Sequence, residues 1–427
     1  MMKSNRFDIT VTEEFIEKCL VWANGFKYFA YFCPNEHTYP HQPYQHLLMV
    51  SNEVLDLDPN NVFGSLQEIS EKDVFIFGHF GYDLKNQLEN LQSSNPDFIR
   101  FPDAGFSKAL HCIHFNYGVT IESNNPESVL EEINKCAHED YNVDADITFK
   151  PSISKEQYLT TVAKLKQHII EGDIYEINYC QEFRSKNTQI DPISTFRSLT
   201  KKSPTPFSTL YKNIEHYLIC ASPERFIKKE GSKLVSQPIK GTARRGSSEY
   251  EDEIIKQELR TNEKELAENM MIVDLVRNDL AKSCIPGSVK VEQMFGIYTF
   301  NQWHQMISTV TGQLKNEVKA IEAIKNAFPM GSMTGAPKIK VMELIEKYEV
   351  SKRGIYSGSV GYFSPNGDFD FNVVIRSLIY NSSTKNLSFQ VGGAITYDSD
   401  ANAEYEECLL KASAISSLFK IDKSQLT

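Results

Sequence analysis

The spacing of hydrophobic and polar residues predicts two kinds of region along the chain. Short alternating runs rich in aromatic residues, such as Asp73–Gly78 and Ile113–Ile121, predict strands of a mixed sheet in the first part. From Ser152 onward the apolar spacing becomes helical, and a helix is expected between Ser154, a candidate N-cap, and Gly172. We therefore place a boundary near residues 139–145. It separates an N-terminal subdomain (1–145) from a larger second domain (146–427).

Blocks of helix and blocks of strand alternate in the larger region. Strands are expected at Ile174–Phe183 and, as a pair, between Val289 and Leu314. Further helices are expected at residues 247–260, 263–281, up to Tyr348 after a loop at 331–338, and at 403–419. No internal repeat is visible, which excludes a solenoid. This block pattern favours an α+β fold over a repeated βαβ winding.

Composition and charge exclude several classes of protein. Of 427 residues, 41% are hydrophobic and 24% charged, which is ordinary for a globular protein and excludes wholesale disorder. The 45 basic and 56 acidic residues leave a net charge of −11, which opposes binding to nucleic acid or to an anionic membrane. No apolar run is long enough to span a membrane, and the eight cysteines are scattered singly. We expect a reduced, cytoplasmic protein.

A cluster of carboxylates near the C-terminus is a candidate metal site. Glu404 and Glu407 are three residues apart on one face of a predicted helix, and Lys411 follows four residues later. Two carboxylates in the first turn of a helix suit a hard cation such as Mg²⁺. The alternative is a solvated acidic face in which Glu407 pairs with Lys411.

A second apolar helix, at Ala267–Leu280, is interrupted by charged residues. Asp274 and Arg277 are spaced for an internal ion pair, whereas Glu268 lies outside that pair. An unpaired buried carboxylate is costly, so Glu268 is the better candidate for binding a metal.

Three further segments contain lysine or small residues of chemical interest. Lys240 lies beside a glycine and close to Arg244 and Arg245, and neighbouring cations or desolvation would lower its pKa enough to make the amine nucleophilic. A solvated basic turn is the alternative. The loop Gly331–Lys338 and the Gly392–Ala394 turn both leave room for close approach of backbone N–H groups to an anion.

Taken together, these segments resemble the chorismate-utilising enzymes, the family that includes anthranilate, aminodeoxychorismate, isochorismate and salicylate synthases. The matching motifs occur in family order over about residues 152–418. They are SPERF, PIKGT, AENMMIVDLVRNDL, GSMTGAPK, RGIYSGSVGY, FNVVIRS, GGAIT and EYEECLLKA. The N-terminal third matches weakly, mainly at GHFGYDL.

The resemblance implies an α+β fold of two large β-sheets in an orthogonal sandwich with flanking helices, with chorismate bound between the sheets. It implies Mg²⁺ held by Glu268, Glu404 and Glu407. It also implies that a set of residues binds the substrate, namely Thr242, Tyr356, Arg376, Gly392, Gly393 and Ala394. An arginine suits a carboxylate because its geometry is bidentate.

Two positions bear on the reaction within the family. Members that activate water carry a lysine base where this chain has Glu176, which argues against water as the nucleophile. Anthranilate synthases carry PIAGT, whereas Lys240 gives the form that resembles aminodeoxychorismate synthase. The resemblance then implies Lys240 as nucleophile at ring C2 and Glu224 as general acid and base. Anthranilate synthase component I remains an alternative.

The resemblance also implies a partner subunit, and the chain departs from the family pattern at one histidine position. No cysteine lies in a G-x-C-x-G context, so a separate glutamine amidotransferase subunit is expected to supply ammonia. A histidine is usual three residues before Ser308, but Gln305 occupies that place and His304 lies one residue earlier. A non-enzyme alternative is a carboxylate-binding regulatory subunit, which would be expected to lack some of the implied catalytic residues.

Overall fold

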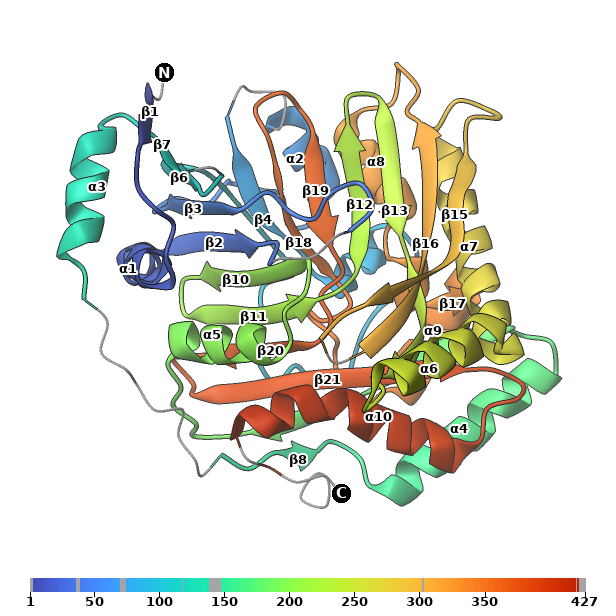
Figure 1. The fold of residues 1–427 in the computed structure, drawn as a ribbon. Coiled ribbons are helices and arrows are strands. Elements are labelled where there is room, and N and C mark those ends of the chain that lie inside the picture. Colours follow the sequence, from blue (N-terminus) through green and yellow to red (C-terminus); the bar gives the residue numbers. More distant parts are fainter. Residues whose placement is uncertain are drawn as a thin grey trace.

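Two large antiparallel sheets and ten helices form the part of the chain that the structure describes. This computed structural model describes residues 3–35, 39–69, 74–116, 118–137, 147–301, 303–419 and 421. The strands of one sheet run across those of the other, and helices flank both (Figure 1). The predicted α+β fold of two crossed sheets is therefore confirmed.

The first sheet has twelve strands. In spatial order they are β1 (Lys3–Phe7), β7 (Val119–Ser123), β6 (His111–His114), β3 (Leu47–Ser51), β2 (Tyr28–Cys33), β10 (Phe207–Asn213), β11 (His216–Ser222), β20 (Ser377–Asn381), β21 (Asn386–Ile395), β9 (Glu176–Ser185) and β17 (Gly335–Ala336), with β8 (Lys150–Pro151) also on β9.

The second sheet has nine strands. Their order is β14 (Ile239–Arg244), β16 (Trp303–Gln313), β13 (Lys233–Gln237), β12 (Arg225–Glu230), β19 (Phe369–Asn372), β18 (Ser359–Phe363), β4 (Ile76–Phe80) and β5 (Ala104–Lys108), with β15 (Lys290–Thr299) also on β16.

The helices cover the outer faces of the sheets. They are α1 (Glu13–Asn24), α2 (Val62–Ile69), α3 (Pro126–Lys135), α4 (Lys155–Ile170), α5 (Pro192–Lys202), α6 (Glu249–Thr261), α7 (Glu263–Ser283), α8 (Ala320–Ala327), α9 (Lys338–Tyr348) and α10 (Ala401–Ser416). Short 3₁₀ turns lie at Tyr82–Gln87, Gly331–Met333 and Ser417–Phe419. No helix in the described ranges is long and apolar enough to cross a membrane.

Strand β2 shows why several strands have no polar face. Phe32 packs in the core between the sheets, whereas Phe29 and Tyr31 pack in a second core beneath α1, α4, α5 and α10. Because both faces of the sheet are covered, successive residues of β2 are apolar rather than alternating. The first sheet is therefore the middle layer of the molecule.

Several predicted elements are confirmed and others are wrong. The helix after Ser154 begins with a capping box to Gln157 and ends before Gly172, as predicted. Residues 113–114 lie in β6 and residues 119–121 lie in β7, so this run is not one strand. Every described strand pair is antiparallel, so the sheet is not mixed. Gly392–Ala394 lie inside β21 rather than in a turn.

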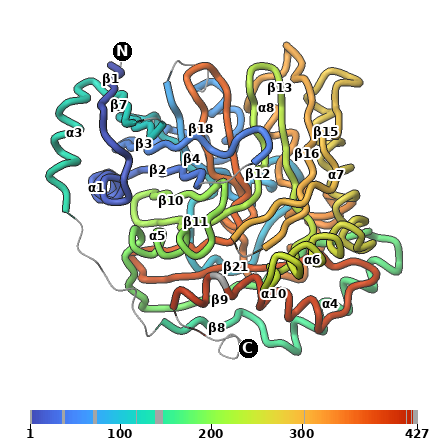
Figure 2. Tube along the Cα trace, viewed as in Figure 1, coloured from blue at the N-terminus to red at the C-terminus, as the bar shows by residue number. Residues whose placement is uncertain are grey.

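The first third of the chain is built into both sheets. Strand β2 pairs with β10 in the first sheet, and β4 pairs with β18 in the second (Figure 2). Strands from residues 1–145 thus hydrogen-bond to strands from residues 146–427, on the other side of the predicted division. The boundary segment itself, residues 139–145, lies outside the described residues, so the division stays a prediction.

A buried ion pair connects the strands beside the centre of the second sheet. Arg225 of β12 donates to both carboxylate oxygens of Asp370 on β19 at 2.9 Å, and also donates to Gln237 and to the carbonyl of Gln42. Arg225 is fully buried, and its guanidinium lies against the ring of Phe207. This network holds the start of β12, directly after Glu224, in a fixed position.

Replacing Arg225 by methionine should destabilise the protein by about 3–5 kcal/mol, because the buried carboxylate of Asp370 would lose its counter-charge. Urea unfolding would measure the loss. The double variant R225M/D370L should recover much of it, since both charges are then absent. A double variant less stable than R225M would contradict this account. Lys256→Met, which breaks an exposed pair with Glu253, is the matched control.

Candidate functional site

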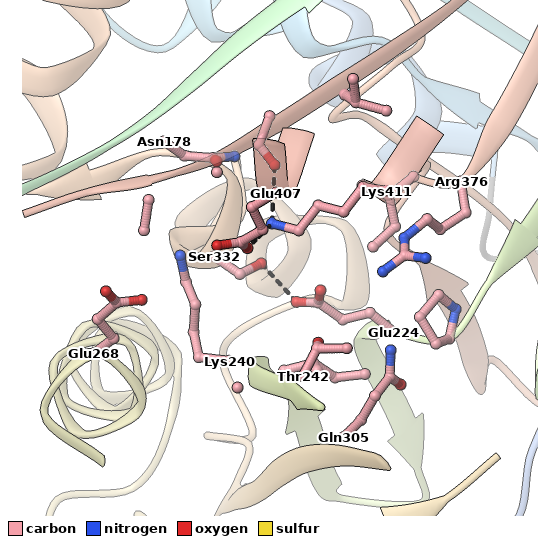
Figure 3. Close-up of a pocket in the computed structure, with 18 of the residues that line it drawn as sticks. Asn178, Glu224, Lys240, Thr242, Glu268, Gln305, Ser332, Arg376, Glu407 and Lys411 are labelled. Carbon is pink, nitrogen blue, oxygen red and sulfur yellow. Dashed lines mark hydrogen bonds and ion pairs between the residues drawn. The ribbon is translucent and has the colours of Figure 1, made fainter. Parts of the chain in front are cut away.

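One cavity of about 380 Å³ lies where the two sheets meet α7 and α10. Figure 3 shows side chains from these elements converging on it. Its volume is typical of a site for a small molecule. Its charged lining consists of five acidic and five basic residues, namely Glu224, Glu265, Glu268, Glu404 and Glu407, and Lys240, Arg244, Lys264, Arg376 and Lys411.

All eleven residues predicted for the site line this cavity. Lys240 and Thr242 come from β14, Glu224 lies just before β12, and Glu268 comes from α7. Tyr356 lies in the loop before β18, Arg376 lies directly before β20, Gly392–Ala394 belong to β21, and Glu404 and Glu407 belong to α10. The fold therefore brings together predicted site residues that are up to 183 positions apart in the sequence. Their individual roles stay predictions.

Lys240 forms an ion pair with Glu176 across the two sheets. Its Nζ lies 2.8 Å from Glu176 Oε1, and both side chains are largely buried. Burial alone would lower the pKa of Lys240, but the carboxylates of Glu176 and Glu268 outweigh it and hold the pKa above its ordinary value. The prediction that neighbouring cations would lower the pKa is wrong, because Arg244 and Arg245 do not face Lys240.

The guanidinium groups of the two arginines pair with helix α6 instead of with Lys240. Arg244 donates to Glu251 and Arg245 donates to Asp252, both in the first turn of that helix. Glu176 Oε2 is buried with no hydrogen-bond partner. Lys240 is thus protonated at rest, with a carboxylate in position to remove its proton.

Glu224 is a buried carboxyl group on the floor of the cavity. Ser332 Oγ donates to Glu224 Oε1 at 2.5 Å (Figure 3). Burial raises the pKa of Glu224 to about 7, against the opposing effects of the Ser332 hydrogen bond and the Lys240 charge. A carboxyl group with this pKa can both donate and accept a proton near neutral pH.

Three glutamates form the other wall of the cavity. Glu404 is 3% exposed, and its Oε1 lies 3.0 Å from the Nζ of Lys264. Glu268 Oε1 is buried without a hydrogen-bond partner and lies 3.7 Å from the same Nζ. Glu407 pairs with Lys411 at 2.7 Å, as the alternative interpretation expected.

These glutamates offer ligand atoms that suit a hard divalent cation. They supply carboxylate oxygens alone, and burial raises the pKa of Glu268 to about 7, so a nearby divalent cation would favour its charged form. In the described residues, the ligand atoms of the three do not all lie within 4.8 Å of one another. Lys264 and Lys411 lie beside their carboxylates and compensate part of the charge.

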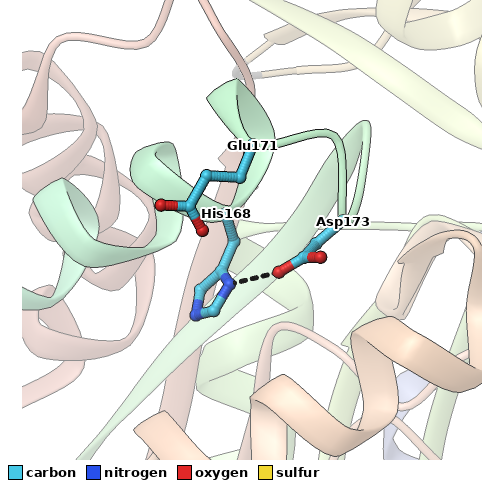
Figure 4. A group of neighbouring side chains, drawn as sticks. All are labelled: His168, Glu171 and Asp173. Carbon is cyan, nitrogen blue, oxygen red and sulfur yellow. Dashed lines mark hydrogen bonds and ion pairs between the residues drawn. The ribbon is translucent and has the colours of Figure 1, made fainter.

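One group in the described chain does have ligand atoms within that distance, but it lies outside the cavity. His168, Glu171 and Asp173 gather at the end of α4 (Figure 4). The ring nitrogens of His168 already contact Asp173 at 2.7 Å and the hydroxyl of Tyr348 at 3.0 Å. This cluster is therefore explained by the C-terminal turn of α4 and its packing on α9.

Strand β21 provides a backbone wall that only small residues allow. A Cβ atom on Gly392 would lie 2.4 Å from the Sγ of Cys180 on the neighbouring strand β9. On Gly393, a Cβ would instead meet Glu404 Oε2 at 3.5 Å, inside the cavity. The small residues thus let β21 pack closely against β9, and the expected approach of this backbone to an anion stays a prediction.

His304 and Gln305 point in different directions. His304 contacts Asp252 at 2.8 Å and Thr299 at 3.0 Å, away from the cavity. Gln305 lines the cavity, is 4% exposed, and its Oε1 has no hydrogen-bond partner. Gln305, rather than His304, therefore faces the cavity.

Sequence reasoning missed several residues of the site. Ser332 is part of the glycine loop that was selected for its backbone, and its hydroxyl was not considered. Lys264 lies one helical turn before Glu268, a spacing that could have indicated the pair. The pairing of Glu176 with Lys240 joins different sheets, and no local pattern encodes it.

The volume of the cavity and its polar and charged lining are typical of a binding site for a small molecule. The family model described as chorismate binding enzyme matches residues 18–417. The chain therefore belongs to the chorismate-binding enzyme family. This confirms the resemblance inferred from the motifs, and the match extends into the N-terminal third.

Proteins named aminodeoxychorismate synthase and proteins named anthranilate synthase are among the relatives of this chain. The chain is 41% identical over 270 residues to the chloroplastic aminodeoxychorismate synthase of Arabidopsis thaliana, covering 62% of this chain but 29% of that protein. It is 33% identical over 345 residues to aminodeoxychorismate synthase component 1 of Escherichia coli, covering 79% and 75%. Its fold is similar to anthranilate synthase component I from Streptococcus pneumoniae, with a TM-score of 0.78 and 25% identity, over 91% and 95% of the chains.

Glu224→Gln should make the protein more stable above neutral pH. Because the folded-state pKa of Glu224, about 7, exceeds the ordinary 4.5, the folded protein binds this proton more tightly and loses stability as pH rises between those values. The amide avoids this cost, so we expect a gain of up to about 3 kcal/mol at pH 8 that shrinks toward pH 5. Urea unfolding at several pH values tests this. A gain that is independent of pH would contradict it.

Proposed function

We propose that the chain is the synthase component of an aminodeoxychorismate synthase, which converts chorismate and ammonia into 4-amino-4-deoxychorismate. The observation that carries the proposal is that Lys240 and Glu224 project into one cavity (Figure 3). Similarity to relatives of that name supports it. The product would serve the synthesis of 4-aminobenzoate and folate.

The proposed reaction begins with activation of Lys240. The ammonium group passes a proton to Glu176, which already accepts its hydrogen bond. The free amine then forms a bond to ring C2 of chorismate. Protonated Glu224 gives its proton to the 4-hydroxyl, which leaves as water.

Ammonia completes the exchange. It forms a bond at C4 while the bond between Lys240 and C2 breaks, and Glu224 takes a proton from the new nitrogen. Glu176 returns its proton to the released amine, which restores the starting state. The near-neutral pKa of Glu224 suits its two roles in this cycle, and Glu176 lies within hydrogen-bond distance of the proton that Lys240 must lose.

Other residues would bind and orient the substrate. Glu268, Glu404 and Glu407 would hold Mg²⁺, which when bound supplies positive charge to a substrate carboxylate. Tyr356, Arg376 and the backbone of Gly392–Ala394 would hold the enolpyruvyl carboxylate, and Thr242 lines the same space. Burial of Arg376 lowers its pKa, but the group stays charged and free to pair with an anion.

A glutamine amidotransferase subunit is the proposed source of ammonia. The word "component" in the name of the Escherichia coli relative is consistent with a partner. None of the cysteines has the sequence context of a glutaminase nucleophile. Ammonium salts should replace the partner in a purified reaction.

Product identity tests the proposal directly. The purified chain would be incubated with chorismate, MgCl₂ and ammonium, with and without an added aminodeoxychorismate lyase. We expect 4-aminobenzoate only when the lyase is present. Anthranilate formed without the lyase would instead establish anthranilate synthase activity, and chorismate binding without turnover would favour a regulatory subunit.

Lys240→Met should reduce formation of the 4-amino product by at least about 100-fold, because the attacking amine is lost. Chorismate binding, measured by equilibrium dialysis with MgCl₂ present, should persist. Lys256→Met, a lysine on the exposed face of α6, is the control and should keep full activity. Undiminished turnover by the Lys240 variant would remove the covalent step from the proposed mechanism.

A further inference from the structure

The ammonium group of Lys264 lies between two of the proposed metal ligands. Lys264 is in the first turn of α7, one turn before Glu268, and faces α10. Its Nζ is 3.0 Å from Glu404 Oε1 and 3.7 Å from Glu268 Oε1. A single cationic atom therefore bridges carboxylates from two helices, which is the position that a bound cation would take.

The side chain of Lys264 is more exposed than those of Glu268 and Glu404, and this difference favours replacement of the lysine by a cation. The side chains of Glu268 and Glu404 are 9% and 3% exposed, whereas that of Lys264 is 37% exposed. The carboxylates are fixed in the wall, and the lysine reaches them from the solvent side on a flexible stem. Glu268 Oε1 accepts no hydrogen bond, so its charge is only partly compensated.

We propose that Lys264 occupies the divalent-cation position in the metal-free protein and that Mg²⁺ binds by exchange with it. An ammonium group has no lone pair and cannot coordinate a metal, so Lys264 must withdraw before both carboxylates can contact one ion. Lys264 is then a competitor that sets the affinity for Mg²⁺. The choice of metal rests on the proposed function.

Charge balance supports this exchange. With Lys264 and Lys411 in place, the three glutamates retain one uncompensated negative charge. Replacing the ammonium group of Lys264 by a divalent cation neutralises the set. If both lysines stayed, the site would instead gain an excess positive charge at the same buried carboxylates, which is less favourable.

Magnesium binding without chorismate tests the proposal. Isothermal titration with MgCl₂ at constant ionic strength would compare the wild type, Lys264→Met and Lys256→Met. We expect K264M to bind Mg²⁺ roughly three- to tenfold more tightly, the range expected for losing a half-buried competing ion pair. K256M, whose pair with Glu253 lies on α6, should match the wild type. Glu404→Gln should bind more weakly than the wild type.

Thermal unfolding gives a second, independent measurement. Without metal, K264M should unfold at a lower temperature than the wild type, because two buried carboxylates lose their counter-charge. Added MgCl₂ should close that gap. A K264M protein that binds Mg²⁺ equally or more weakly would show that Lys264 supports the site instead of occupying it. Absence of Mg²⁺ binding in every variant would overturn the proposal, whatever product chorismate yields.

Discussion

Compensation of buried charge is the constraint on which the functional site depends. Several of the charged side chains that line the cavity, among them Lys240, Glu268 and Glu404, are largely buried, and a buried charge is tolerable only beside an opposite one. The pairs that satisfy this requirement join elements that are distant in sequence. Lys240–Glu176 connects the two sheets, and Lys264–Glu404 connects α7 to α10. The ion pairs therefore fix the geometry of the cavity as well as its charge.

The charges around Lys240 and Glu224 shift the proton equilibria of these two groups in ways that suit opposite roles. Carboxylates around Lys240 favour its protonated form, whereas burial of Glu224 without a full counter-charge favours its neutral form. Arg353 extends the arrangement behind the site, where it is held by Glu349 and donates to the carbonyls of Met333 and Asn178. It thereby ties the loop that carries Ser332 to strand β9.

Most of the correct predictions came from local sequence patterns and from motifs that occur in family order. The capping box at Ser154 and the apolar periodicity of α4 are encoded within one segment, so that helix could be predicted closely. Motifs located all eleven site residues because each motif is a short, distinctive string. The pairing of Lys240 with Glu176 could not be predicted, since an ion pair between distant segments leaves no local pattern. Gly392–Ala394 were misplaced in a turn, because close packing against Cys180, rather than chain reversal, requires a glycine at position 392.

The order of strands in the first sheet also constrains when the protein can fold. The hairpin β20–β21 lies between β11 and β9, two strands that precede it by roughly 160 to 200 residues. Until the ribosome has made that hairpin, β9 and β11 each present an unpaired edge, and the wall formed by Gly392–Ala394 does not exist. Most of the chain must thus be synthesised before the sheet closes, which exposes the nascent protein to misassociation and favours slow, late folding.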